Sequence, residues 1–465
     1  MATTRVETPV SAVEKSTIKK VSIRLVPFVA LMFFINYLDR SAIGFAAPNG
    51  MNDDLALTVT QVGFASGVFF IGYILLEVPS NLALARFGAR RWLARIMVSW
   101  GIVAVLFTWV GSFEHLAILR FALGAAEAGF FPGAILFLSL WVPSRHRGKI
   151  LALFYLAQPL STVIGAPLAG LLIGAHGFLG LEGWRVMFLG VGVPAIIVGI
   201  VAWFYLKDKP TDAKWLTSEE QQWLTTELAA EKTKTEALSV VKGKERGGLK
   251  VAFTSGRVWI LAFIYFGFIY GLYTLAFFLP TIISGFQEQY GVEYNVFEKG
   301  LITAVPYIPA AIALWLWTRD VSKRGLKTWH IAGPAIVAAV TVPLALFAGS
   351  PQLTIAIIAL TAMAIFAVLP NFWTLPTQFL TGAAAAAGVA LINTIGNLAG
   401  FSAPYITGAV ADATKSADGT PQYFVAMGIV GFFMLLSAIL MIILSRLRST
   451  KTISDQALSG PTVIH

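Results

Sequence analysis

The chain has 465 residues, of which 57% are hydrophobic and only 12% are charged. Soluble globular proteins contain about 45–50% apolar and about 25% charged residues, so this composition excludes an ordinary soluble protein. Cysteine is absent, which excludes a disulfide framework, a thiolate metal site and a cysteine nucleophile. The net charge of +10 would indicate nucleic-acid binding only if the basic residues formed a patch on a soluble face.

Long apolar stretches recur along the chain, and each could cross a bilayer as a helix of about 20 residues. The predicted spans lie near 25–46, 60–82, 93–110, 116–139, 150–174, 184–206, 258–284, 300–317, 329–348, 352–376, 383–410 and 422–445. They predict an all-α membrane protein with twelve transmembrane helices in two six-helix halves. The predicted boundaries are 1–206 for the N-terminal half with its tail, 207–257 for a central loop, and 258–465 for the C-terminal half with its tail.

The central loop contains one predicted surface helix. Thr217 and Glu220 have the spacing of a capping box, in which each residue satisfies a backbone N–H of the other. Trp223, Leu224 and Leu228 then recur at helical spacing. We expect a helix on the cytoplasmic face, followed by a flexible linker over 232–250.

Basic residues fall on one side of the predicted bundle. If both termini are cytoplasmic, the cytoplasmic segments hold 29 of the 34 Lys and Arg residues. Short basic loops remain in the cytoplasm during insertion, so the asymmetry predicts this orientation and accounts for the high net charge without nucleic acid. We expect no cleaved signal peptide. Two parallel halves joined by a long loop are typical of transporters with a central site.

Four charged residues lie inside predicted spans, namely Asp39 and Arg40 in the first and Arg120 and Glu127 in the fourth. Each would cost about 2.5–3.5 kcal/mol at a helix centre, so they must be paired, hydrated or neutralised. Arg120 and Glu127 are seven residues apart, which places them on one helical face. They could form a proton relay coupled to an anion site, because burial favours a neutral carboxyl and a guanidinium favours a charged one. A static salt-bridge network is the alternative.

Polar uncharged residues at similar depth are candidates for contacts with a substrate. Gln158 and Asn393 could hydrogen-bond hydroxyl or carboxylate groups, and Tyr73 could point into a central cavity, although such residues also tie helices together. Glu77 lies one turn beyond Tyr73. We expect Glu77 to form a structural ion pair with the basic turn Arg86–Arg91.

Five short motifs resemble those of one transporter family at matching spans. They are Asn36-Tyr37-Leu38-Asp39-Arg40, Glu77-Val78-Pro79-Ser80-Asn81, Arg120 with Glu127-Ala128-Gly129-Phe130-Phe131-Pro132-Gly133, Ala157-Gln158-Pro159, and Leu391-Ile392-Asn393-Thr394-Ile395-Gly396-Asn397. Over nearly its full length the chain resembles the major facilitator superfamily, and within it the anion:cation symporters. The details are most similar to the tartrate and phthalate branch.

The resemblance implies the major facilitator fold and a set of functional residues. It implies that Asp39 and Glu127 carry protons and that Arg40 and Arg120 support coupling or anion binding. It also implies that the central site is lined by Tyr37, Tyr73, Gln158, Trp373 and Asn393.

We therefore expect a proton-coupled symporter that imports an organic carboxylate by alternating access. A tartrate-like hydroxy acid, a phthalate-like aromatic acid and a sugar acid all remain open as cargo. Protons serve as the coupling ion, with no other cofactor and no nucleic-acid partner expected. We expect a monomer in the inner membrane of a bacterium. A proton-coupled exporter of drugs or metabolites on the same fold is the main alternative, and a channel or a membrane-embedded enzyme is more distant.

Overall fold

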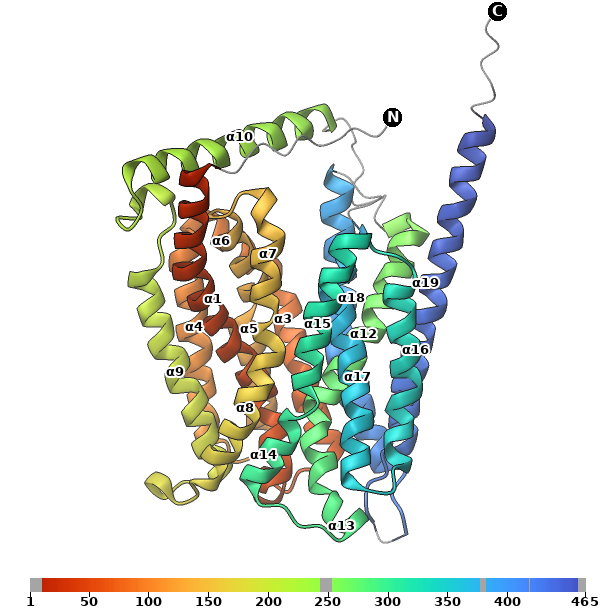
Figure 1. The fold of residues 1–465 in the computed structure, drawn as a ribbon. Helices are drawn as coiled ribbons and strands as arrows, with labels where there is room; N and C mark the ends of the chain where they lie inside the picture. The colour runs from red at the N-terminus through yellow and green to blue at the C-terminus, as the bar shows by residue number, and fades with distance from the viewer. Residues whose placement is uncertain (1–10, 243–252, 377–381, 418, 459–465) are drawn as a thin grey trace, which may run out of the picture.

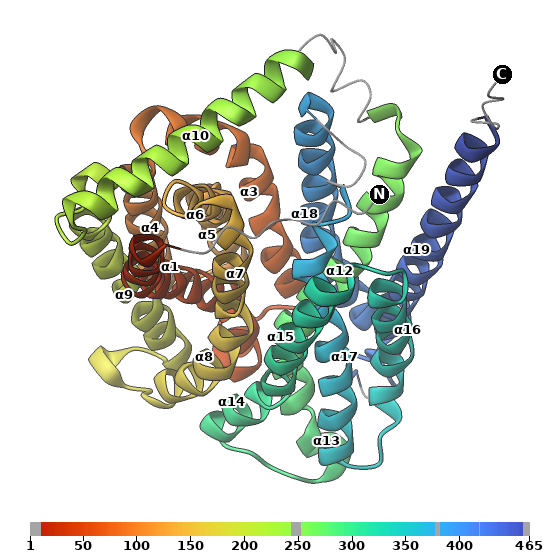
Figure 2. The same ribbon diagram turned by 45° about the horizontal axis from the view of Figure 1, so that its top comes forward.

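The computed structural model describes residues 11–242, 253–376, 382–417 and 419–458. These residues are almost entirely helical and include no strand. Figure 1 shows two groups of long helices side by side, with α1–α9 in one group and α12–α19 in the other. Helix α10 lies across one end of the first group (Figures 1 and 2).

The first group and the crossing helix are built from ten elements. They are α1 (Ala12–Ala46), α2 (Asn52–Asp54), α3 (Val59–Phe87), α4 (Ala89–Leu106), α5 (Phe113–Glu127), α6 (Phe130–Ser139), α7 (Ser144–Tyr155), α8 (Ala157–Gly174), α9 (Gly183–Tyr205) and α10 (Ser218–Lys242). The second group contains eight. They are α12 (Gly256–Ser284), α13 (Phe286–Tyr290), α14 (Val296–Ala304), α15 (Tyr307–Arg324), α16 (Trp329–Leu344), α17 (Pro351–Phe372), α18 (Gly382–Ala413) and α19 (Phe424–Leu458).

The membrane spans agree with the sequence prediction. Among the described residues, 11 helical segments are long and apolar enough to cross a membrane. Helix α18, with 32 residues, covers the remaining predicted span. The predicted all-α fold with twelve spans is therefore confirmed.

Three of the predicted spans are interrupted, and one interruption positions a charged residue. The span predicted over 116–139 is divided into α5 and α6 by Ala128 and Gly129. Gly129 has a φ of 85°, a left-handed conformation that suits glycine. A β-carbon at this position would also lie 2.5 Å from the Ser80 hydroxyl on α3. The break leaves Glu127 as the last residue of α5, inside the bundle rather than at its surface.

The two helix groups pack closely at the end opposite α10. A β-carbon on Gly63 of α3 would collide with the carbonyl oxygen of Pro404 on α18, so glycine permits the close approach of these helices. At the same end, Asp412 of α18 accepts hydrogen bonds from Thr60 of α3, 2.7 Å from the backbone nitrogen and 2.6 Å from the hydroxyl. The start of α3 is thus capped by a carboxylate from the other group.

Helix α10 is attached to the first group through polar contacts. Its predicted capping box is present, because Thr217 N–H donates to Glu220 and Glu220 N–H donates to Thr217 Oγ1. Glu220 also accepts from Lys20 at 2.8 Å and from Ser16 at 2.7 Å, both on α1. Arg147 of α7 pairs with Glu231 at 3.2 Å. These contacts hold α10 against α1 and α7.

The predicted linker over 232–250 is wrong in its first part, because α10 continues through Lys242. No glycine or proline interrupts the sequence from Ser218 until Gly243, and this stretch is rich in Glu, Lys and Ala, which favour helices. Residues 243–250 of the predicted linker lie outside the described residues.

Candidate functional site

A cavity of about 690 Å³ lies between the two helix groups. The lining side chains come from both groups and include five tyrosines, three amides, one arginine and one glutamate. They are Phe33, Tyr37, Arg40, Tyr73, Glu77, Phe131, Tyr155, Gln158, Tyr265, Ile269, Leu272, Tyr273, Leu369, Trp373, Asn393 and Asn397.

Arg40 connects this cavity to a buried acid. Its side chain is 13% exposed, whereas Glu127 has no exposed surface. Arg40 Nη2 lies 2.9 Å from Glu127 Oε2, and Arg40 Nη1 donates to the Tyr273 hydroxyl of α12 at 3.1 Å. The guanidinium carbon also lies 5.2 Å from the centre of the Tyr73 ring. Arg40 therefore contacts the cavity, the buried acid and the other helix group at once.

Glu127 is held from two sides by α1. Asn36 Nδ2 donates to the same Oε2 atom at 2.7 Å, one helical turn before Arg40. The second oxygen, Oε1, has no hydrogen-bond donor among the described residues. Glu127 is thus a buried carboxyl with one oxygen bonded and one oxygen available to carry a proton.

Asp39 lies next to this pair and is also fully buried. Its electrostatic neighbours are Glu127, Arg120 and Arg40. Asp39 is also within hydrogen-bond reach of Glu127. The two buried acids of α1 and α5 are therefore direct neighbours inside the bundle.

Arg120 has no exposed surface and contacts backbone rather than substrate space. Its Nε donates to the Ala65 carbonyl at 3.2 Å and its Nη2 to the Ser66 carbonyl at 3.4 Å. Asp39 and Glu127 both act on it electrostatically. Of the four charged residues predicted inside spans, Arg40 alone lines the cavity, and Asp39, Arg120 and Glu127 lie behind it.

The structure brings together all five side chains that the resemblance assigned to a central site. Tyr37, Tyr73, Gln158, Trp373 and Asn393 line the one cavity. Tyr37 is buried, and its hydroxyl interacts with the Gln158 side chain in the same cavity. The cavity therefore presents a guanidinium, tyrosine hydroxyls and amides to one small molecule.

Glu77 is in a different environment from the one expected. It accepts hydrogen bonds from Asn393 of α18, with Asn393 Nδ2 at 2.9 Å from Oε1 and 3.2 Å from Oε2, and it lines the cavity. Arg86 lies nine residues along α3, about two and a half turns, and so points to the opposite face. The basic turn instead pairs with Asp208, whose Oδ1 accepts the Arg90 backbone N–H at 2.9 Å.

Several other cavity residues were not predicted. Tyr265 and Tyr273 project from α12, Tyr155 from α7, and Asn397 lies one turn beyond Asn393 on α18. The spacing of Asn393 and Asn397 is a signal that could have identified the second amide. Tyrosines in an apolar span carry no such signal, because most of them pack against other helices.

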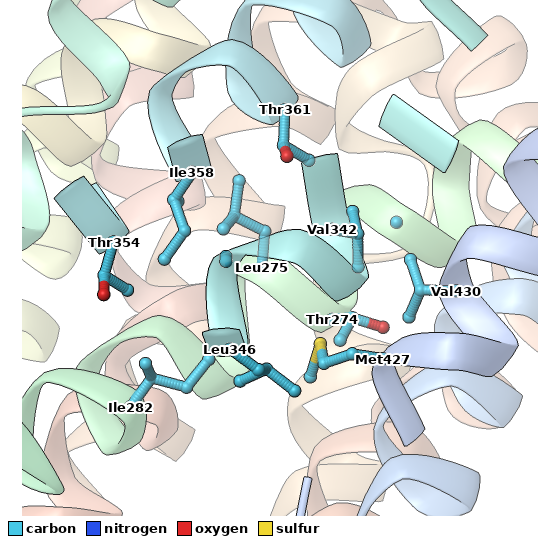
Figure 3. Close-up of a pocket in the computed structure, with 12 residues that line it drawn as sticks. Thr274, Leu275, Ile282, Val342, Leu346, Thr354, Ile358, Thr361, Met427 and Val430 are labelled. Atoms are coloured by element: carbon cyan, nitrogen blue, oxygen red, sulfur yellow. The ribbon is translucent and has the colours of Figure 1, made fainter. Parts of the chain in front are cut away.

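A second pocket, of about 470 Å³, lies within the second helix group. Figure 3 shows its lining side chains, among them Leu275, Ile358, Met427 and Val430. The polar side chains in this lining are threonines, and no charged residue belongs to it. This pocket offers an anion no cationic partner, so the cavity around Arg40 is the better candidate site.

Comparisons with known proteins agree with the fold. Residues 29–404 match the family described as the Major Facilitator Superfamily. The chain is 46% identical over 435 residues to the "Putative tartrate transporter" of Agrobacterium vitis, which covers 93% of this chain and 92% of the relative. It is 36% identical over 443 residues to the "Quinolone resistance transporter" of Acinetobacter baumannii, which covers 95% of this chain and 99% of the relative.

A solved structure supports the same fold. The crystal structure of a bacterial homologue of the human lysosomal transporter Spinster, inward-facing and occupied, has a TM-score of 0.68. It covers 90% of this chain and 96% of its own, at 19% identity. The chain is therefore a multi-pass membrane transporter for a small organic substrate and belongs to the Major Facilitator Superfamily, in a branch similar to the anion:cation symporters.

Proposed function

We propose that this transporter is a proton-coupled symporter that imports an organic carboxylate by alternating access of its two helix groups. The observation that carries the proposal is the position of Arg40. One side of its guanidinium faces the cavity, and the other is bonded to Glu127, which is buried beside Asp39.

Arg40 suits a carboxylate cargo because a guanidinium can donate two parallel hydrogen bonds to it. The Tyr37 hydroxyl and the Gln158 amide lie in the same cavity and could contact the rest of the cargo. The tartrate transporter relative supports a hydroxy acid, while aromatic acids and sugar acids also fit a cavity with tyrosines and amides.

Coupling would follow from competition for Arg40. A cargo carboxylate that takes hydrogen bonds from Arg40 weakens the attraction between Arg40 and Glu127, and this favours a proton on the Glu127–Asp39 pair. By linkage, a proton on the pair frees Arg40 for the cargo, so each ligand raises the affinity for the other. Arg120, which is buried on the side of the pair away from the cavity, would stabilise the negative charge that remains on the pair.

We infer the orientation, the membrane and the oligomeric state of the transporter as follows. Helix α10 and both termini are cytoplasmic, the membrane is the bacterial inner membrane, and one chain acts as a monomer. Loop charge supports this orientation, since 29 of the 34 basic residues belong to the segments that the sequence predicts to be cytoplasmic. Protons would be the coupling ion, with no further cofactor.

Uptake of labelled L-tartrate into proteoliposomes with an imposed pH gradient tests the proposal. The wild-type protein should accumulate tartrate when the outside is acidic, and Glu127→Gln should lose accumulation. Glu127→Gln should still exchange labelled for unlabelled tartrate across the membrane, because exchange needs binding and alternation but no net proton transfer.

Glu288→Gln provides a matched control, since Glu288 is exposed on the short helix α13. This variant should accumulate tartrate as the wild type does. If Glu127→Gln accumulates tartrate at the wild-type level, the proton relay is wrong.

A second candidate function is proton-coupled export of a drug or metabolite. The quinolone resistance relative supports it, and the acidic Glu77 in the cavity could attract a cationic group. Inhibition of transport separates the two functions. A carboxylate symporter should be inhibited by small organic anions, whereas a cationic drug exporter should be inhibited by lipophilic cations.

A further inference from the structure

Glu77 and Asn393 form a polar contact that the proposed proton relay does not use. Both oxygens of Glu77 on α3 lie within hydrogen-bond distance of Asn393 Nδ2 on α18, at 2.9 and 3.2 Å. Both residues are partly exposed and both line the cavity. The contact therefore joins the two helix groups at the wall of the proposed substrate site.

An ionised carboxylate can only accept hydrogen bonds, and a side-chain amide has a donor end and an acceptor end. Both oxygens of Glu77 lie within hydrogen-bond distance of the Asn393 amide nitrogen, so Glu77 holds the donor end of this amide toward itself. The carbonyl oxygen of Asn393, Oδ1, lies at the other end of the same amide group and is directed away from Glu77. The cavity wall thus offers an oriented acceptor at this position.

Arg40 and Asn393 line the same cavity, so a cargo held by Arg40 would occupy the space that the acceptor borders. The Arg40 guanidinium contacts the ring of Tyr73, and Glu77 follows Tyr73 by four residues on the same face of α3. Four residues of helix span about 6 Å, the length of a four-carbon acid. A cargo whose carboxylate binds Arg40 could therefore present a hydroxyl group to Asn393.

We propose that Glu77 is a positioning residue that orients the Asn393 amide, so that the site prefers carboxylates with hydroxyl groups over the same acids without them. The inference rests on the proposed carboxylate transport and adds to it a residue for cargo selection. A hydroxyl can donate to the fixed Oδ1 atom, whereas a methylene at that place leaves a polar group of the site unpaired.

L-Tartrate and succinate are suitable probes, because they have the same four-carbon chain and two carboxylates and differ in two hydroxyl groups. Competition with labelled tartrate, and the KM of each acid in proteoliposomes, give their relative affinities. The wild type should bind tartrate about tenfold more tightly than succinate, the preference that one good neutral hydrogen bond can give.

Glu77→Gln should bring the two affinities close together, mainly by raising the KM for tartrate while kcat changes little. The new amide could donate or accept, so it would no longer fix the orientation of Asn393. Glu77→Asp keeps an acceptor-only group and should restore part of the preference. Asn393→Ala removes the acceptor itself and should also abolish the preference, which keeps the test valid if Glu77→Gln folds poorly.

A Glu77→Gln or Asn393→Ala variant that keeps the wild-type ratio of tartrate to succinate affinity would overturn the inference and leave the proposed function standing. A wild-type protein that binds both acids equally would also overturn it. If the wild type binds no organic acid at all, the proposed function itself fails, and the inference fails with it.

Discussion

Arg40 Nη2 and Glu127 Oε2 are 2.9 Å apart, and this contact joins a cavity-facing guanidinium on α1 to a carboxylate without exposed surface at the end of α5. The same guanidinium donates to Tyr273 of the other helix group. A change in the hydrogen bonds of Arg40 therefore alters the environment of a buried acid and a contact between the two helix groups.

Removal of Arg40 alone should destabilise the protein more than removal of Arg40 and Glu127 together. Loss of one member of a buried charge pair typically costs about 3–5 kcal/mol, because the other charge is left unpaired. We expect Arg40→Gln to lower the free energy of unfolding by an amount near the lower end of this range, since Asn36 still donates to Glu127. The double variant Arg40→Gln/Glu127→Gln should recover most of the loss in chemical unfolding measured in detergent.

Tyr273→Phe is the matched comparison, because it removes a single hydrogen bond to the same guanidinium and should cost about 1 kcal/mol. Additive losses for Arg40→Gln and Glu127→Gln would show that the two side chains are energetically independent, contrary to the geometry.

The contact between Asp412 and Thr60 should stabilise closure of the end opposite α10. Asp412 accepts from the backbone N–H and the hydroxyl of Thr60 in the first turn of α3, where a carboxylate is favoured by the unpaired N–H groups of the helix. Asp412→Asn should weaken this cap and populate conformations that are open at that end.

Labelling of a single cysteine can measure this opening, since the chain has no native cysteine. A cysteine in place of Ile269 lies on the cavity wall. An impermeant maleimide added outside intact cells should react with it several-fold faster in the Asp412→Asn background. Lys415→Gln removes only a partly exposed ion pair to Asp412 and should have a smaller effect. Equal labelling rates in the otherwise wild-type protein, in Asp412→Asn and in Lys415→Gln would contradict the role of Asp412 in closure.

Docking of α10 should depend on pH through Glu220. Burial opposes ionisation of this residue, but hydrogen bonds from Lys20, the Thr217 backbone and Ser16 lower its pKa to about 2. Because the folded pKa lies below the ordinary value of about 4.3, the stabilisation is present above that pH and is lost as the pH falls toward 2.

A spin label on a cysteine at Thr225, which is exposed on α10, reports this docking. The label should be restricted at pH 7 and gain mobility progressively as the pH falls from about 4 toward 2, where docked Glu220 takes up a proton. Glu220→Gln should give a mobile label already at pH 7. Unchanged mobility in that variant would mean that Glu231 and the other contacts hold α10 without Glu220.

Much of the fold could be predicted from composition because a bilayer demands long apolar helices, and each predicted span coincides with one helix or with two consecutive helices. The break at Gly129 could not be predicted in the same way, because it combines a left-handed φ with the close approach of Ser80, a residue distant in the sequence. The extension of α10 to Lys242 was also missed, although the absence of glycine and proline before Gly243 favours it.

The sequence predicted which residues line the candidate site better than it predicted what those residues contact. Tyr37, Gln158 and Asn393 share one cavity, as the family resemblance implied. Distance along the chain does not identify the partner of Glu77, because helical phase turns Arg86 to the opposite face and Asn393 comes from another helix. Arg120 similarly contacts the carbonyls of α3 rather than a cargo, a detail that only the packing of two helices can determine.

Proton movement that accompanies the cargo is the most direct measurement of symport. Proteoliposomes that contain a trapped pH-sensitive dye, with equal pH on both sides, would receive external L-tartrate. Symport through the Arg40–Glu127–Asp39 cluster predicts acidification of the interior that rises with tartrate concentration, is absent in Glu127→Gln liposomes and is abolished by a protonophore. Tartrate entry without any acidification would contradict proton-coupled symport.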